Sequence, residues 1–315
     1  MSERLVGSTP LVKIKIRFNG KVKNIYAKLE YYNYTGSIKD RLAEKVITES
    51  YKNGTLKKGM PIVEATSGNT GISFAALGAL YGHEVFIFMP DWVSGERIKI
   101  IEMYGANVYL ISKEQGGFKE AIKRADILAN KIQGFRPNQF SNQLNILAHY
   151  EGTGREIVNS LNNISAFVSG FGTGGTIMGV SKRIKEKFPN ARIVAMEPEN
   201  MTLLSANKKV GSHRIEGIGD DFLPDLMDTK LIDKVVKIND AEAINMAKVL
   251  AKKLGLGVGI SSGANFLASA LIKEDNVVTI FADDLKKYLS TDLTKPKATK
   301  KYISDEIEII EMSII

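Results

Sequence analysis

Two kinds of apolar pattern alternate along most of the chain. Short β-branched runs have the length and composition of buried strands, and they occur at 61–65, 84–89, 107–111, 166–169, 192–196 and 277–281. Apolar residues at helical spacing predict helices at 72–81, 95–104, 118–132, 152–159, 176–187, 241–254 and 262–271. Strands that alternate with helices in this way predict a largely parallel sheet with helices on both faces.

The two ends of the chain show other patterns. Residues 11–18 and 24–29 look like the strands of a hairpin, because Asn19-Gly20 between them is a strong turn signal. After Thr291 the chain becomes rich in lysine and then acidic and aliphatic. This last segment is interpreted either as an edge strand or as a loose end.

Composition narrows the possible functions. The chain has 315 residues, of which 44% are hydrophobic, and this length suits two domains or one large one. It contains no cysteine, which excludes disulfides, a thiol nucleophile and cysteine-ligated metals. With no H-E-x-x-H motif and no histidines paired at ligand spacing, no metal site is expected.

Charge and hydropathy bear on partners and location. The net charge of +8 is spread along the chain in isolated pairs, without the aromatic-interleaved basic stripe of a nucleic-acid binder. A mild positive field of this kind helps to collect small anions. The first ten residues lack the apolar core of a signal peptide, and no apolar run reaches the length of a membrane span. We therefore expect a cytoplasmic protein with no membrane or nucleic-acid partner.

The loop E-A-T-S-G-N-T-G at 64–71 is the most informative segment. It joins a predicted buried strand to a predicted helix, and it combines hydroxyl groups, one amide and two glycines. At a helix N-terminus, such a loop directs backbone N–H groups and short hydroxyl donors at one point, which suits a carboxylate. The alternative is an ordinary N-cap with a glycine turn.

Two further glycine motifs each have a misleading interpretation. The stretch 170–175 matches G-x-G-x-x-G between a strand and a helix, and Glu197 follows at the end of the next strand, so an NAD-dependent oxidoreductase is a rival hypothesis. Hydroxyls at Thr173 and Thr176 suit a phosphate monoester at least as well.

The stretch 259–263 matches the nucleophile elbow G-x-S-x-G of serine hydrolases. That fold needs a catalytic histidine later in the chain, and His83, His149 and His213 all come before the motif.

Lys39 is the candidate amine. It follows a flexible Thr-Gly-Ser turn at the start of a predicted helix. Taken alone it is read as a surface lysine, but the field at a helix N-terminus favours the neutral amine that Schiff-base chemistry requires. An amine, a phosphate cradle, a carboxylate cradle and a serine on a tight turn together indicate pyridoxal phosphate acting on an amino acid.

The ordered motifs resemble one family across nearly the whole chain. They are G-S-T-P-L-V, K-L-E-Y, G-S-I-K-D-R, E-A-T-S-G-N-T-G, M-P-D-W-V-S-G-E-R, Y-G-A-N-V, Q-F-S-N-Q, G-T-G-G-T, E-G-I-G-D-D-F-L-P and G-I-S-S-G-A. The chain resembles the cysteine synthase and cystathionine β-synthase family, with its tryptophan-synthase-β-like fold. The resemblance implies an α/β protein with two domains, each a mainly parallel sheet flanked by helices. Residues 36–142 would form a smaller domain that moves and binds the substrate carboxylate. Residues 1–35 and 143–315 would form a larger domain with the phosphate loop.

The resemblance also implies residue roles. Lys39 would hold pyridoxal 5′-phosphate as an internal aldimine and later move the Cα proton. The other cofactor contacts would be Asn69 at the 3′-oxygen, Ser261 at the pyridine nitrogen, and the phosphate cradle Gly172, Thr173, Gly174, Gly175 and Thr176. The substrate would be held by Thr66, Ser67, Gly68, Asn69, Thr70, Gln139 and Gly217. A serine cannot keep the pyridine nitrogen protonated, which weakens the electron sink and favours loss of a β-substituent over transamination.

The implied reaction is β-replacement or β-elimination through an aminoacrylate, on cysteine, serine or O-acetylserine. The second substrate would be a thiol, sulfide or water, and the enzyme a homodimer. Asp220 is unusual for the family, and its position leaves a solvent-facing carboxylate or a catalytic group as open interpretations. As a catalytic group it would repel hydrosulfide and deprotonate water or a neutral thiol, which favours consuming cysteine and releasing H2S. An NAD enzyme and a non-catalytic pyridoxal-phosphate-binding homologue remain the alternatives.

Overall fold

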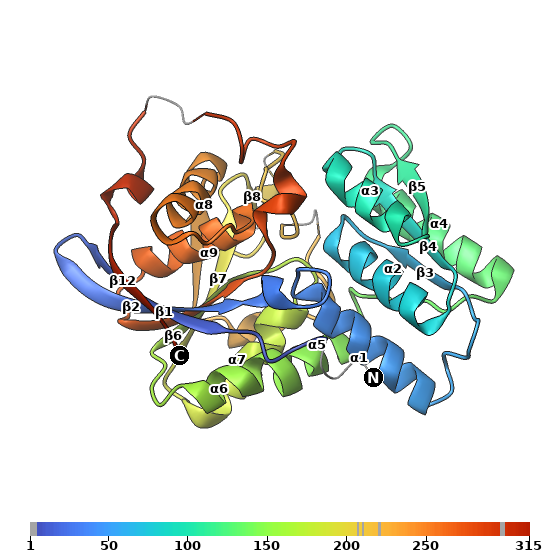
Figure 1. The fold of residues 1–315 in the computed structure, drawn as a ribbon, viewed down its shortest axis with the longest axis horizontal. Helices are drawn as coiled ribbons and strands as arrows, with labels where there is room; N and C mark the ends of the chain where they lie inside the picture. The colour runs from blue at the N-terminus through green and yellow to red at the C-terminus, as the bar shows by residue number, and fades with distance from the viewer. Residues whose placement is uncertain (1–4, 207, 210, 220–221, 297–299) are drawn as a thin grey trace.

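The protein is an α/β fold with two main sheets (Figure 1). The computed structural model describes residues 5–206, 208–209, 211–219, 222–296 and 300–315. Within these residues the large sheet has seven strands in the order β10-β7-β6-β11-β2-β1-β12, and the small sheet has three in the order β3-β4-β5. All neighbours in the small sheet are parallel, as are those of the large sheet from β10 to β2. The predicted fold class is confirmed.

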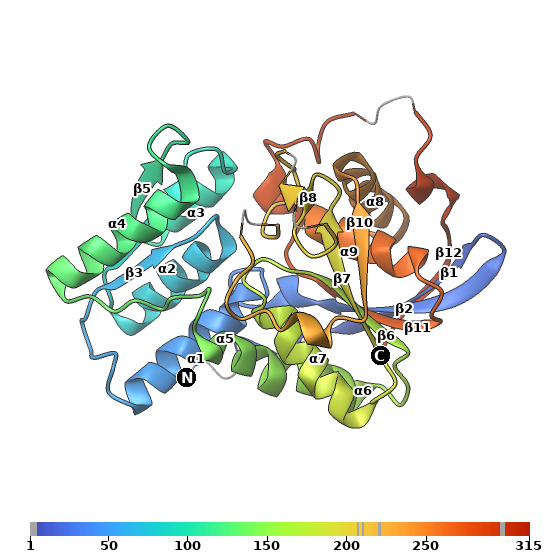
Figure 2. The same ribbon diagram turned by 180° about the vertical axis from the view of Figure 1, so that it is seen from behind.

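The large sheet is covered by helices on both faces because its strands alternate their side chains between two cores. Along β6, Ala166 and Val168 pack with α8 and α9, while Phe167 points to the other face and packs with α6 and α7. The same layering is visible from behind (Figure 2). The strands of the large sheet are β1 Leu11–Phe18, β2 Lys21–Leu29, β6 Ala166–Gly170, β7 Arg192–Pro198, β10 Lys234–Ile238, β11 Asn276–Phe281 and β12 Glu308–Ile314. The helices that cover it are α6 Arg155–Ser160, α7 Gly175–Lys187, α8 Asp240–Leu254 and α9 Ile260–Leu271.

The small sheet is built by the same alternation. Ile62 packs towards α1 and α2, and its neighbour Val63 packs towards α4. Its strands are β3 Ile62–Ala65, β4 Val85–Pro90 and β5 Asn107–Ile111. Its helices are α1 Lys39–Lys52, α2 Asn69–Tyr81, α3 Gly95–Met103 and α4 Gly117–Ile132. The division into domains at 36–142 stays a prediction.

Three segments differ from the predicted pattern or decide between its alternatives. The helix predicted at 152–159 begins earlier, as α5 Gln143–Ala148 followed by a π-helix, η3 His149–Gly154. The strand β10 had no predicted counterpart. The C-terminal segment forms β12, which pairs antiparallel with β1 and makes an edge of the large sheet.

Short elements complete the described chain. They are β8 Met201–Thr202, β9 Lys208–Lys209, η2 Glu30–Tyr32, η4 Thr229–Leu231, η5 Leu285–Tyr288 and η6 Ile303–Glu306. The predicted hairpin between β1 and β2 is confirmed, with positive φ at both Asn19 and Gly20. Among the described residues, no helix is long and apolar enough to cross a membrane.

Candidate active site

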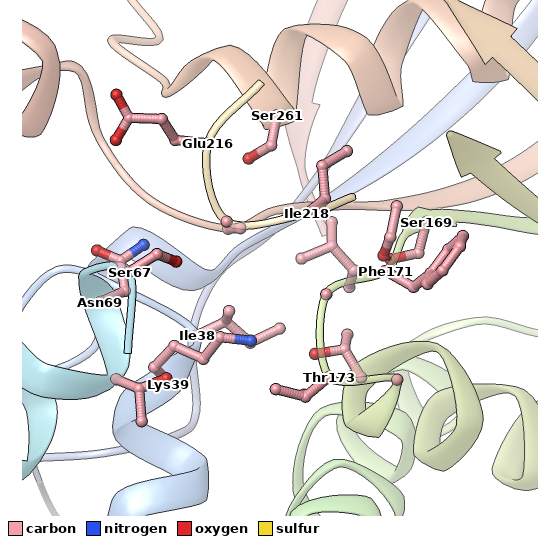
Figure 3. Close-up of a pocket in the computed structure, with 18 of the residues that line it drawn as sticks. Ile38, Lys39, Ser67, Asn69, Ser169, Phe171, Thr173, Glu216, Ile218 and Ser261 are labelled. Carbon is pink, nitrogen blue, oxygen red and sulfur yellow. Dashed lines mark hydrogen bonds between the residues drawn. The ribbon is translucent and has the colours of Figure 1, made fainter. Parts of the chain in front are cut away.

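One pocket gathers most of the predicted site residues (Figure 3). Its walls include Lys39, Thr66, Ser67, Asn69, Thr70, Gln139, Gly172, Thr173, Gly174, Thr176, Gly217 and Ser261. Gly68 and Gly175 belong to the same loops without being part of this lining. Asp220 lies outside the described residues. The pocket brings together segments separated by more than 200 positions in the sequence.

Lys39 is the first residue of α1, and its side chain reaches into the pocket (Figure 3). The loop before it is tied down by the buried Asp40, which accepts from the Thr35 amide at 2.7 Å. Asp40 also accepts from the Ser73 hydroxyl on α2 at 2.6 Å. Burial raises the pKa of Asp40, and these hydrogen bonds act against that rise. Asp40 therefore fastens the start of α1 to α2.

Arg41 fastens the same helix to the large sheet. It bonds Glu30 Oε2 through Nε at 2.6 Å and Glu156 Oε1 through Nη1 at 2.7 Å, and Lys28 Nζ lies 2.7 Å from Glu156 Oε2. Burial acts to raise the pKa of Glu156, but Arg41 and Lys28 outweigh it and lower the pKa to about 2. Asp40 and Arg41, the two residues after Lys39, therefore hold the start of α1 against α2 and against Glu30 and Glu156.

The predicted carboxylate loop connects β3 to α2. Gly68 has φ +156°, which favours glycine, and its amide donates to Thr66 Oγ1 at 3.1 Å. Thr70 donates its hydroxyl proton to Gln139 Oε1 at 2.7 Å, and Gln139 Nε2 donates to the Ala65 carbonyl at 2.8 Å. Gln139 is thus fixed on both sides of its amide beside a loop 69 residues away in sequence.

The predicted phosphate cradle lies between β6 and α7. Gly174 has φ +86°, and Asn145 packs so closely on Gly175 that a Cβ there would lie 2.0 Å from Asn145 Oδ1. Asn145 Nδ2 donates to Thr173 Oγ1 and to the Gln139 carbonyl, both at 2.9 Å. This one amide joins the predicted phosphate cradle to Gln139 of the predicted carboxylate site.

The N-terminus of α7 has the chemistry of an anion site. The first N–H groups of a helix have no acceptor within it, and they point out of its end. Thr173 and Thr176 add hydroxyls, and Thr176 Oγ1 lies 3.3 Å from His149 Nε2. Burial, together with Lys39 and Arg41, lowers the pKa of His149 well below its usual value, so this histidine is neutral at physiological pH.

Ser261 lies in the first turn of α9 and borders the pocket on the side away from Lys39 (Figure 3).

The glutamate that would bind the ribose of NAD in the dinucleotide motif has a different role in the structure. Glu197 is fully buried and accepts from the Leu204 amide at 3.0 Å and from the Ser205 hydroxyl. Its carboxylate therefore anchors the chain that follows β7 and does not face a ribose site.

The structure shows a network of polar side chains beside the pocket that the sequence analysis did not predict. Asn69 donates from Nδ2 to Asp283 Oδ2 at 2.7 Å and accepts at Oδ1 from Lys287 at 3.1 Å. Arg97 and Glu216 line the pocket and form an ion pair at 3.1 Å. Both residues stood inside recognised motifs, but no local signal indicated that they would meet. Among the described residues, no three histidine, aspartate or glutamate side chains are grouped to hold a metal ion.

The donor set fits pyridoxal phosphate. A helix N-terminus with two hydroxyls and a neutral histidine suits a phosphate monoester, and Lys39 supplies an amine across the same pocket from Ser261. The fold and this site define a pyridoxal-phosphate enzyme of the tryptophan-synthase-β-like type. Residues 3–283 match the family described as "Pyridoxal-phosphate dependent enzyme", and the chain belongs to that family.

The chain is similar to several characterised proteins. It is 48% identical to a hydrogen sulfide-producing enzyme of Fusobacterium nucleatum, with a TM-score of 0.95 over 99% of this chain and 97% of that one. It is 43% identical to cysteine synthase B of Campylobacter jejuni over 92% of this chain and 96% of that one. It is 36% identical to the O-acetylserine dependent cystathionine beta-synthase of Helicobacter pylori, with a TM-score of 0.86 over 94% and 98% of the two chains. The chain is a pyridoxal-phosphate-dependent β-replacement enzyme that uses amino-acid substrates.

Proposed function

We propose that this enzyme consumes cysteine and releases sulfide in preference to making cysteine from O-acetylserine. The observation that carries the proposal is the likeness to the hydrogen sulfide-producing enzyme, at 48% identity over nearly the whole of both chains. The aspartate at position 220 supports the same direction, because a carboxylate there repels hydrosulfide and accepts a proton from water or a neutral thiol. Asp220 is the proposed catalytic base of the second half-reaction.

Each group in the pocket has a proposed task. Lys39 forms the covalent link to the cofactor and moves the proton at Cα. The loop 66–70 and Gln139 bind the substrate carboxylate, and Gly217 borders the substrate. The cradle at 172–176 holds the phosphate, Asn69 holds the 3′-oxygen, and Ser261 faces the ring nitrogen. When bound, pyridoxal phosphate supplies the electron sink that lets the bond to the β-substituent break.

The geometry supports these tasks through preorganisation. Thr70 gives its hydroxyl proton to Gln139, and the Gly68 amide donates to Thr66 Oγ1. We therefore assign the Ser67 hydroxyl, the other backbone amides of the loop and the second N–H of Gln139 Nε2 as donors to the carboxylate. We further propose that residues 36–142 close as a unit over the bound substrate, which excludes water from the reacting atoms.

A second cavity offers a route by which the second substrate can reach the pocket. A larger cavity of about 760 Å³ adjoins the pocket and shares Ser67, Glu216, Gly217 and Ile218 with it. Its walls carry Lys113, Lys119 and Arg214. We propose that the thiol or water enters here and that the leaving sulfide departs by the same path.

The direction of the reaction is tested with the purified holoenzyme. Sulfide released from L-cysteine is compared with cysteine formed from O-acetylserine and sulfide, each as kcat/KM at matched pH. We expect sulfide release to be the faster reaction. A larger kcat/KM for cysteine formation would identify the protein as a biosynthetic cysteine synthase.

Asp220 is tested by comparing Asp220→Ala with Asp221→Ala, its immediate neighbour. Rapid-scanning absorbance separates departure of the β-substituent from addition of the nucleophile. We expect Asp220→Ala to slow addition more than departure, and Asp221→Ala to leave their ratio unchanged. Unchanged kinetics of both steps in Asp220→Ala would make this residue a solvent-facing carboxylate.

We also propose that the enzyme is a cytoplasmic homodimer. Its lack of cysteine is compatible with a reducing compartment, and the family resemblance implies the dimer. Light scattering of the purified protein tests the dimer, because a mass near 34.6 kDa would show a monomer. Cell fractionation tests the location.

A further inference from the structure

Arg97 lies directly beneath the proposed carboxylate loop. It comes from α3, and only 1% of its side chain is exposed. Its Nη1 donates to the Ser67 carbonyl at 3.2 Å. A Cβ on Gly68 would lie 2.4 Å from the same Nη1 and 2.6 Å from Arg97 Cδ. The loop therefore rests on this guanidinium group, and it can do so only with glycine at position 68.

The other side of the guanidinium faces residues beside the large sheet. Arg97 Nη2 lies 3.1 Å from Glu216 Oε2 and 3.7 Å from Asp283 Oδ2. Its Cζ lies 5.0 Å from the centre of the Tyr288 ring. Burial acts to lower the pKa of Arg97, but Tyr288, Glu216 and Asp283 outweigh it and raise the pKa, so Arg97 stays charged.

Asp283, which lies beside Arg97, holds the loop at a second residue, Asn69. Asp283 Oδ2 accepts from Asn69 Nδ2 at 2.7 Å and from the Tyr288 hydroxyl at 2.8 Å. Ser67 is thus held through Arg97, and Asn69 is held through Asp283. A trans peptide directs its C=O and N–H to opposite sides. Fixing the Ser67 carbonyl towards Arg97 therefore turns the Gly68 amide to the other side, where it meets Thr66 Oγ1.

We propose that Arg97 is a positioning residue for recognition of the substrate α-carboxylate. It holds the loop 66–70 in its anion-binding form before substrate arrives and joins that loop to Glu216 and Asp283 across the cleft. Without it, substrate binding must also order the loop, and the affinity for the carboxylate falls. This inference rests on the proposed role of the loop, but not on which β-substituent leaves or which nucleophile adds.

A pair of unreactive ligands isolates the carboxylate. L-Alanine has no β-leaving group, and ethylamine is the same molecule without its carboxylate. Both are titrated into holoenzyme while the cofactor absorbance is followed. Arg97→Lys keeps the charge but has one nitrogen in place of a planar fork, so it cannot serve Ser67 and Glu216 together. We expect L-alanine to bind about tenfold more weakly, the effect of losing one charge-assisted hydrogen bond. Ethylamine affinity and cofactor content should stay unchanged.

Two further variants keep the test decisive. Lys23→Arg is the control, because Lys23 is also a buried cation and donates to the Ser269 and Glu274 carbonyls, away from the pocket. It should lower the melting temperature without changing the ratio of the two affinities. If Arg97→Lys does not fold, Glu216→Gln is used, because it weakens the anchor of Arg97 and should reduce L-alanine affinity in the same direction. An equal loss for both ligands, or no loss for either, would overturn the inference. Neither result bears on the direction of cysteine turnover.

Discussion

A methyl group at position 175 should disrupt the phosphate loop from within. In Gly175→Ala the new Cβ would lie 2.0 Å from Oδ1 and 2.7 Å from Nδ2 of Asn145. Atoms cannot approach so closely, so the Asn145 amide has to move away. It would then lose its bonds to Thr173 Oγ1 and the Gln139 carbonyl, both 2.9 Å long and buried.

The size of the effect follows from those two bonds. Each buried polar group left without a partner costs about 1–3 kcal/mol, so losing the two bonds should cost about 2–6 kcal/mol in total. If the whole cost appears in the affinity for the cofactor, that affinity falls by roughly 30- to 20,000-fold. The assay is equilibrium titration of the apoenzyme with pyridoxal phosphate, followed by absorbance, with thermal unfolding measured in parallel.

Two companion variants make the reasoning refutable. Gly95→Ala is the matched control, since a Cβ there would meet nothing within 4 Å. It should leave cofactor binding unchanged. Asn145→Ala creates room for the methyl group, so Asn145→Ala with Gly175→Ala should be less impaired than the sum of the single variants. Wild-type cofactor affinity in Gly175→Ala, or strict additivity in the double variant, would refute the steric argument.

Three other predictions test the site and its anchors. Lys39→Ala should lose turnover and the borohydride-reducible link to the cofactor, and a reducible link on another lysine would contradict the assignment. Ser261→Ala should retain the cofactor, because one neutral hydrogen bond is worth about 1 kcal/mol, but it should slow β-elimination in stopped-flow absorbance. Loss of all bound cofactor would exclude this. The pKa of Glu156 falls from 4.5 to about 2 on folding, so its contribution is present above pH 4.5 and is lost as pH falls towards 2. It amounts to about 3 kcal/mol at most. Urea unfolding between pH 2 and 6 should show a shallower acid slope in Glu156→Gln, and an unchanged slope would refute the pairing.

The apolar pattern predicts the inner strands well because both of their faces are buried. Strands such as β6 and β11 are buried at nearly every position, and most of their residues are apolar. The edge strand β10 has lysine at two of its five positions, which hides it in the same pattern. The beginning of the helical segment at α5, before the predicted helix at 152–159, escaped prediction for another reason. Asn145, His149 and Thr153 are fully buried polar residues, so its inward face does not look apolar.

The site could be predicted as far as its local motifs reach. The loops 66–70 and 172–176 are each a few consecutive residues, so composition and position before a helix are visible in the sequence. The bond from Asn69 to Asp283 spans 214 positions, and Arg97 meets Glu216 across the cleft. Such pairs depend on how the two sheets are placed, which no short motif encodes.

The pairing of β2 with β11 determines when the large sheet can form during synthesis. Asn24 faces Asn276 across this pair, 252 positions later in the chain. The ribosome adds about 5–20 residues per second, so the hairpin of β1 and β2 waits roughly ten seconds to a minute for its partner. The strands β3 to β5 emerge within 50 consecutive residues and can pair long before then. Through most of its translation the nascent chain therefore carries this hairpin without the β11 strand that pairs with its β2 edge. During that interval the unpaired edge is most in need of a chaperone.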